Sequence, residues 1–192
     1  NLARTLLLPG VKDLIARKAR FLSASLGALK TDVAAARKVF ADWPSPIVVA
    51  SEAIGGELLF PASSIENDFA WAPAHPVVDA YRAFKPMPYD APTSAMAATL
   101  YAVRPQENYF NLSAPGTISV LDDGAAKFTK SPEGKHRYLT VEPGQEQRII
   151  KTYIELASAK PVPRQPRFRR QQQQQQQAPP KPPIAKPPQS GF

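Results

Sequence analysis

The sequence predicts an α/β fold with a mainly parallel sheet flanked by helices, and three observations lead to this prediction. Residues 46–50 form a continuous apolar run rich in β-branched side chains, which is typical of a parallel strand covered by helices on both faces. An amphipathic helix pattern and an earlier apolar segment precede this run, so that strand, helix and strand follow one another. After Ala159 the composition no longer supports a core, which predicts a disordered tail.

The first 40 residues alternate helical and extended patterns. Residues 2–8 are an apolar helical segment that ends at Pro9-Gly10, and residues 11–20 continue with apolar side chains at helical spacing. Residues 21–26 have the length and composition of a short buried strand. Residues 31–40 begin with Thr31, a residue type that caps helices, and place apolar side chains on one face.

The middle and the end of the body are predicted to be mostly helical. Residues 63–69 open with the Ser-x-x-Glu spacing of a capping box, which starts a short helix. Residues 76–84 and 94–103 are further helices, the second with small alanines that permit close packing. Residues 145–157 close the body with apolar side chains recurring at three and four residues.

Between the last two helices the pattern changes to short strands. Residues 117–120 alternate in polarity, residues 127–128 and 137–141 are further extended segments, and Asp122-Asp123-Gly124 supplies a turn. Asp-Gly between alternating segments favours a hairpin over a calcium-binding fragment, the alternative that paired carboxylates suggest. We therefore expect a small antiparallel hairpin addition to the parallel sheet.

The chain divides into a body, residues 1–159, and a basic Pro/Gln-rich tail, residues 160–192. The tail holds seven of the 24 basic residues, none of the 16 acidic ones and nine of the 22 prolines. The net charge of +8 is therefore +7 in the tail and +1 in the body. Arginines around Phe168 suit contact with nucleic acid through phosphates and base stacking, and a solvated linker is the alternative. They are Arg167, Arg169 and Arg170.

The sequence contains none of the common catalytic or cofactor motifs. The absence of cysteine excludes disulfides, zinc–thiolate sites and thiol nucleophiles, and the spacings of zinc proteases, serine hydrolases, P-loops and dinucleotide-binding folds are missing. His75 and His136 each stand alone, so we interpret them as caps or surface hydrogen-bonding residues. No apolar run approaches the roughly 20 residues of a membrane span.

Two groups of residues remain as candidates for a ligand site. Acidic residues follow the central strand, in the region where open α/β sheets bind ligands, with solvated surface carboxylates as the alternative. Aromatic residues are concentrated in the central third and suit a base-stacking pocket, with core packing as the alternative. The acidic residues are Glu52, Glu57, Glu66 and Asp68, and the aromatic ones are Trp43, Phe69, Trp71, Tyr81, Phe84 and Tyr89.

Six segments of the body form a recognisable pattern. They are 31–40 (TDVAAARKVF), 43–48 (WPSPIV), 52–55 (EAIG), 100–105 (LYAVRP), 116–120 (GTISV) and 134–139 (GKHRYL). Together they resemble the C-terminal half of the inosine/uridine-preferring nucleoside hydrolases, over roughly residues 1–155. The resemblance implies a mainly parallel α/β fold and hydrolysis of the N-glycosidic bond of ribonucleosides by water that an aspartate-bound calcium ion activates. Because the likeness begins in the family's interior and the chain begins at Asn1, we expect the domain to be incomplete.

The sequence departs from the family pattern in three places. None of the eight aspartates has the Asp-x-Asp-x-x-x-Asp-Asp spacing of the family's N-terminal metal cluster. Leu26, Gly27 and Ala28 stand where the family has the Glu-Phe-Asn that holds the ribose hydroxyls. Ala95, preceded by Ser94, stands where the family has a calcium-binding aspartate. We therefore predict no catalytic, cofactor-binding or metal-binding residues in this chain and no calcium bound by this chain alone.

Two functions follow from these observations. The first is a nucleoside hydrolase-like protein, with a nucleoside as its ligand by resemblance, that is inactive alone. The alternative is a non-catalytic binding or interaction protein whose basic tail contacts anionic partners. The sequence leaves open enzymatic activity of the parent protein, substrate preference, a homo-oligomer, and a location in the bacterial cytoplasm or periplasm, because the lack of cysteine fits both compartments.

Overall fold

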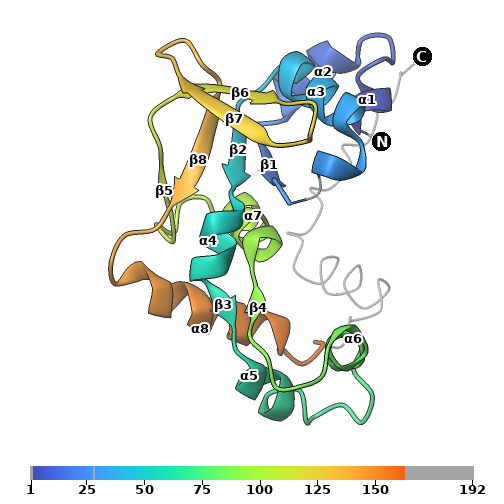
Figure 1. Cartoon of the computed structure of the whole chain (residues 1–192), viewed down its shortest axis with the longest axis vertical. Helices are drawn as coiled ribbons and strands as arrows, with labels where there is room; N and C mark the ends of the chain where they lie inside the picture. Colours follow the sequence, from blue (N-terminus) through green and yellow to red (C-terminus); the bar gives the residue numbers. More distant parts are fainter. Residues whose placement is uncertain (1, 28, 163–192) are drawn as a thin grey trace, which may run out of the picture. The chain divides into compact units, whose positions relative to one another are not determined.

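The computed structural model describes residues 2–27 and 29–162 (Figure 1). The predicted tail, residues 160–192, lies almost entirely outside these residues, so its disorder and the boundary at Ala159 stay predictions. Among the residues that are described, no helix is long and apolar enough to cross a membrane.

Three parallel strands form the centre of the body. β1 (Leu22–Ser25) pairs with β2 (Ile47–Ala50), and β2 pairs on its other side with β8 (His136–Thr140), so that β2 lies between the other two (Figure 1). All four residues of β2 are buried. The prediction of a parallel, fully covered central strand is confirmed.

One predicted strand has a different main partner from the one expected. β6 (Gly116–Val120) and β7 (Ala126–Lys130) form the expected antiparallel hairpin, and β5 (Asn111–Leu112) pairs antiparallel with β8. The segment 137–141, however, belongs mainly to β8, which runs parallel to β2 in the sheet order β1-β2-β8-β6-β7. Alternating polarity identifies a strand but not its neighbour or direction, and here the neighbour is the buried β2.

Helices cover both faces of the sheet. Ile47 and Val49 of β2 belong to one apolar cluster, which includes Phe40 of α3 (Val33–Asp42). Val48 and Ala50 belong to the other cluster, which includes residues of α7 (Ser94–Val103). Side chains of a strand alternate between its faces, so this division places α3 and α7 on opposite faces of β2.

The remaining described elements are helices and a second pair of strands. They are α1 (Leu2–Thr5), α2 (Val11–Lys18), the 3-10 turn η1 (Leu29–Thr31), α4 (Glu52–Glu57), β3 (Leu59–Phe60), α5 (Ala62–Asn67), α6 (Pro76–Phe84), β4 (Ala91–Pro92) and α8 (Gln145–Ala157). β3 and β4 form a separate antiparallel pair. α1 is shorter than predicted, and α4 was not predicted.

Two predicted helix caps are wrong. Asp32, not Thr31, caps α3, because its carboxylate accepts a hydrogen bond from the Ala35 amide at 2.9 Å. The capping box at 63–66 does not form, since α5 begins at Ala62. The Ala62 amide instead donates to the Asp90 carboxylate at 2.8 Å, so a residue 28 positions away satisfies the helix start.

The start of α7 is fixed by close contact with α4. A Cβ atom added at Gly55 would lie 2.6 Å from the Ser94 amide nitrogen and 2.7 Å from the Ser94 Cβ. A Cβ atom at the neighbouring Gly56 would meet nothing within 4 Å. The two glycines therefore form a matched pair, of which only Gly55 is required for packing.

We predict that Gly55→Ala lowers the free energy of unfolding by about 1–3 kcal/mol, because the two helices must move apart. Gly56→Ala should leave it unchanged or raise it by up to about 1 kcal/mol, since alanine is the better helix former. Urea denaturation of both variants measures the difference. Equal free energies for the two variants would contradict the close approach of α4 and α7.

Candidate functional site

The carboxyl ends of β1 and β2 open onto a pocket of about 270 Å³, here called the carboxyl-end pocket. Its lining residues are Leu26, Gly27, Lys30, Ser51, Glu52, Gly124, Ala125, Ala126 and Tyr138. Ligands of open α/β sheets bind beyond the carboxyl ends of the strands. Of the four acidic residues singled out from the sequence, only Glu52 lines this pocket. Glu57, Glu66 and Asp68 are exposed to solvent, as the alternative of solvated surface carboxylates predicts.

Residues from three separate segments meet beside this pocket. Ser25, the last residue of β1, donates a hydrogen bond through its hydroxyl to the Ser94 hydroxyl at 3.1 Å. The Gly27 amide donates to the Ser25 hydroxyl at 3.5 Å. A Cβ atom at Gly27 would lie 3.7 Å from Glu52 Oε1, so the glycine lies beside that carboxylate. The parallel sheet therefore brings residues 25–27, 52 and 94 together.

At the start of α7, two neighbouring residues lie on different surfaces of the body. Ala95 is exposed and lines a different groove, between α7 and α8, together with residues such as Met96 and Tyr153. Consecutive residues of a helix point about 100° apart, so a shift by one residue changes the face. Ser94, not Ala95, contacts the end of β1.

The residues beside the carboxyl-end pocket do not fit a calcium ion. Calcium takes six to eight oxygen ligands, usually including several carboxylates. Ser25 and Ser94 offer neutral hydroxyls, and Glu52 is the one carboxylate that lines the pocket. Within 2–27 and 29–162, no group of three or more histidine, aspartate or glutamate residues is arranged to hold a metal. Ala28, one of the three positions that the resemblance assigns to ribose binding, lies outside the described residues.

The aspartate pair forms the predicted hairpin turn. Gly124 has a φ of +79°, a conformation that glycine adopts most readily, and the Ala125 amide donates to the Asp123 carboxylate at 2.9 Å. Asp122 forms an ion pair with Arg37 at 2.5 Å. Hydrogen bonding to this guanidinium lowers the pKa of Asp122 below its usual value. Both carboxylates therefore act locally in the turn.

The two histidines have different roles. His75 is the N-cap of α6, and its Nδ1 accepts a hydrogen bond from the Val77 amide at 3.3 Å, which confirms its interpretation as a cap. His136 is only 6% exposed, so its interpretation as a surface residue is wrong. Its Nδ1 accepts a hydrogen bond from the Ile118 amide at 2.8 Å, and its ring meets the edge of Phe40 at 5.7 Å. Burial lowers the pKa of His136.

The aromatic residues do not share one pocket. Phe69 is buried in the core, and Tyr81 packs against the same cluster, as core packing predicts. Tyr81 stacks on Tyr89 with ring centroids 5.4 Å apart, whereas Phe84 is 82% exposed. Trp43 lies in another part of the body, where it lines a groove beside His136. None of these residues lines the carboxyl-end pocket.

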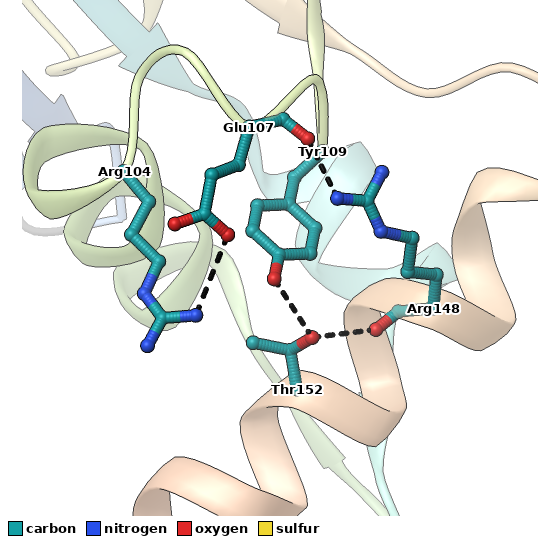
Figure 2. Close-up of polar contacts among 5 residues, drawn as sticks. All are labelled: Arg104, Glu107, Tyr109, Arg148 and Thr152. Atoms are coloured by element: carbon teal, nitrogen blue, oxygen red, sulfur yellow. Dashed lines mark hydrogen bonds and ion pairs between the residues drawn. The ribbon is translucent and has the colours of Figure 1, made fainter.

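A polar cluster between the end of α7 and α8 had no signal in the sequence (Figure 2). Arg148 donates a hydrogen bond to the Glu107 carbonyl at 2.7 Å and lies over the Tyr109 ring at 4.3 Å. Thr152 and the Tyr109 hydroxyl are 3.3 Å apart, and Arg104 pairs with the Glu107 carboxylate at 3.4 Å. Arg148 is 41 residues from Glu107 in the sequence, and Thr152 is 43 residues from Tyr109. The cluster fastens the loop before β5 to α8.

No family model matches this chain, and no curated protein matches it. Among solved structures, an inosine-guanosine nucleoside hydrolase is similar, with 12% sequence identity and a TM-score of 0.47. The match covers 64% of this chain and 43% of that structure's chain. This chain therefore spans less than half the length of that protein.

We predict that His136 makes stability depend on pH. Because the pKa of His136 is lowered from 6.5 in the folded state, the unfolded chain binds a proton first as the pH falls. The stabilisation is therefore complete above about pH 6.5 and declines as the pH falls through the range between the unfolded and folded pKa values. Denaturant titrations between about pH 5 and 8 measure this decline.

His136→Asn is the control for this prediction. Its amide oxygen replaces Nδ1 as acceptor for the Ile118 amide but does not titrate. The free energy of unfolding of the wild type should fall relative to that of the variant as the pH falls. The contributions of all other titrating groups are the same in both proteins and cancel in the difference. A difference between the two proteins that stays constant with pH contradicts the assignment.

Proposed function

We propose that this chain is a nucleoside hydrolase-like protein that does not cleave nucleosides by itself. One observation carries the proposal. The segments that carry the positions assigned by the resemblance to ribose binding (26–28) and to metal binding (Ala95) approach each other beside the carboxyl-end pocket, where their neighbours Ser25 and Ser94 share a hydrogen bond. The two segments are 69 residues apart in the sequence, and their approach supports the proposal. The side chains differ from those of the family.

The chemistry explains why this arrangement would be inactive. Cleaving an N-glycosidic bond requires an activated water and stabilisation of a sugar that gains oxocarbenium character. In the family, calcium supplies the activated water. Here Glu52 is exposed, and among the described residues no hydrogen bond or ion pair orients it. Ser25 and Ser94 contribute only hydroxyls, which are neutral at physiological pH.

The carboxyl-end pocket retains groups that suit a polyhydroxylated ligand. Lys30 and Glu52 line it and provide a donor and an acceptor for hydroxyl groups. Its volume of about 270 Å³ is close to the lower end of the usual range for ligand pockets, about 300 Å³. A nucleoside, bound mainly through its ribose, is the ligand that this proposal assigns.

We predict that the purified chain releases no ribose from inosine or uridine above background, with or without calcium. The missing carboxylates leave no described group that can hold the ion and activate water. A reducing-sugar assay measures the release. Turnover that depends on calcium would overturn the inactive assignment.

The location of the site has its own test. Ser94→Asp places a carboxylate beside Ser25, and calcium binding that the unmodified chain lacks should become measurable, since calcium affinity follows the number of charged ligands. Ala95→Asp adds the same charge on another face of α7 and should leave the affinity unchanged. Calorimetric titration compares the two variants. Equal calcium affinities would show that the carboxyl-end pocket is not the remnant site.

The alternative function is contact with anionic partners through the tail, and the charge of residues 160–192 favours it. Replacing all seven basic residues of the tail by glutamine removes this charge without shortening the chain. Retention on RNA or anionic vesicles should then fall, most strongly at low salt. Equal retention of both proteins would exclude the alternative.

A further inference from the structure

A second cavity lies at the amino ends of the parallel strands and shares no residue with the carboxyl-end pocket. This amino-end groove has a volume of about 570 Å³. Its walls come from α3 and Trp43, from β6, and from residues 133–136 at the start of β8. The Ile47 amide donates to the Lys135 carbonyl at 2.9 Å, which ties this end of β8 to β2.

One hydrogen-bonding edge of the β6 backbone faces this groove. On the hairpin side, the Leu121 amide donates to the Ala125 carbonyl. Both backbone groups of a strand residue point to the same side, and the side alternates along the strand, so Ile118 and Val120 face away from β7. Only Gly116 of β6 pairs with β8. Beyond Gly116 this edge is therefore open.

Two side chains bind the open edge and are fixed by it. His136 accepts a hydrogen bond from the Ile118 amide at 2.8 Å, and Arg37 Nε donates to the Val120 carbonyl at 2.7 Å. Because Nδ1 of His136 is an acceptor, the neutral ring carries its proton on Nε2. Nε2 has no hydrogen-bond partner among the residues described. The ring therefore carries one unpartnered N–H donor on a side chain that lines the groove and is more than nine-tenths buried.

The charges around the groove favour a monoanion. Arg37 and Lys135 line it against one acidic residue, Glu133. The partner of Arg37 outside the groove, Asp122, is 99% exposed, so this ion pair is weak in water. Within the described ranges, the Lys135 ammonium makes no hydrogen bond or ion pair. One positive charge is therefore available to a ligand.

The remaining wall of the groove is apolar, aromatic and held in place. The indole N–H of Trp43 donates to the Ser45 hydroxyl at 2.9 Å, and Ser45 is buried. Phe40 meets the His136 ring edge-on. Flat aromatic faces of fixed orientation suit a planar ring, which buries its apolar surface with little loss of side-chain freedom.

We propose that the amino-end groove is a binding site for a small monoanion in which a planar ring carries a carboxylate. The carboxylate accepts a hydrogen bond from Nε2 of His136 and pairs with Lys135, and the ring lies against Trp43. The volume of about 570 Å³ is within the usual range of small-molecule sites. This proposal is independent of the proposed function, because the two cavities have no common residue.

Benzoate and its neutral analogue benzamide test the proposal on the full chain. NMR signals of the Trp43 indole and the His136 ring should shift saturably with benzoate. Benzamide should bind about tenfold more weakly, the change expected for losing one charge-assisted hydrogen bond. Equal affinities for the two compounds, or shifts that do not saturate, would overturn the proposal.

Variants identify the groups that hold the carboxylate. His136→Asn keeps the acceptor for Ile118 but removes the Nε2 donor, and Lys135→Gln removes the charge; each should weaken benzoate binding about tenfold. Lys127→Gln on β7, outside the groove, is the matched control and should bind as the wild type does. Lys135 is exposed, so its variant keeps the test valid even if His136→Asn fails to fold. If Lys135→Gln bound benzoate as tightly as the wild type does, the proposed site would be wrong.

Discussion

The parallel pairing of β2 with β1 on one side and β8 on the other is the constraint on which the rest of the body depends. The residues of β2 are at most 4% exposed, because α3 and α7 cover its two faces. Such burial on both faces is stable only when every backbone group is paired within the sheet. The pairing aligns the strand ends, and this alignment produces a carboxyl-end pocket and an amino-end groove.

The carboxyl-end pocket depends on close contacts between elements that lie far apart in the sequence. Gly55 allows α4 to approach α7 closely, and this contact fixes Ser94 beside Ser25. Had these positions carried carboxylates, the same backbone geometry would have gathered several hard oxygen ligands, as calcium requires. Ser25 and Ser94 provide only neutral hydroxyls, and the proposed function therefore assigns binding but not activation of water to this pocket. On the proposed function, the fold is therefore kept although the hydrolase activity is lost.

The sequence predicted elements whose signal is local. The buried run of β2 and the periodic helices α3, α6, α7 and α8 were found because burial imposes a pattern on neighbouring residues. Interactions between residues that lie far apart in the sequence were not predicted. Asp90 supplies the start of α5 in place of the predicted capping box, and β8 takes its direction from β2 rather than from the hairpin.

The same limit applies to the sites. The position of Glu52 beyond the central strand was predicted, because the strand order places it there, and a ligand site at this pocket stays a prediction. The contact of Ser94 with Ser25 was not predicted, since it depends on how the completed helix is turned against the sheet. The burial of His136 was missed because Lys135 and Arg137 on either side suggested a surface position. Contacts such as that of Arg148 with Glu107 depend on the completed fold.

The central claim is that the parallel sheet gathers residues 25–27, 52 and 94 without assembling a calcium site. Calorimetric titration of the unmodified chain with calcium, in the presence of inosine, tests it most directly. The account predicts only heats of dilution over the whole titration. Saturable binding of one calcium ion per chain would contradict it.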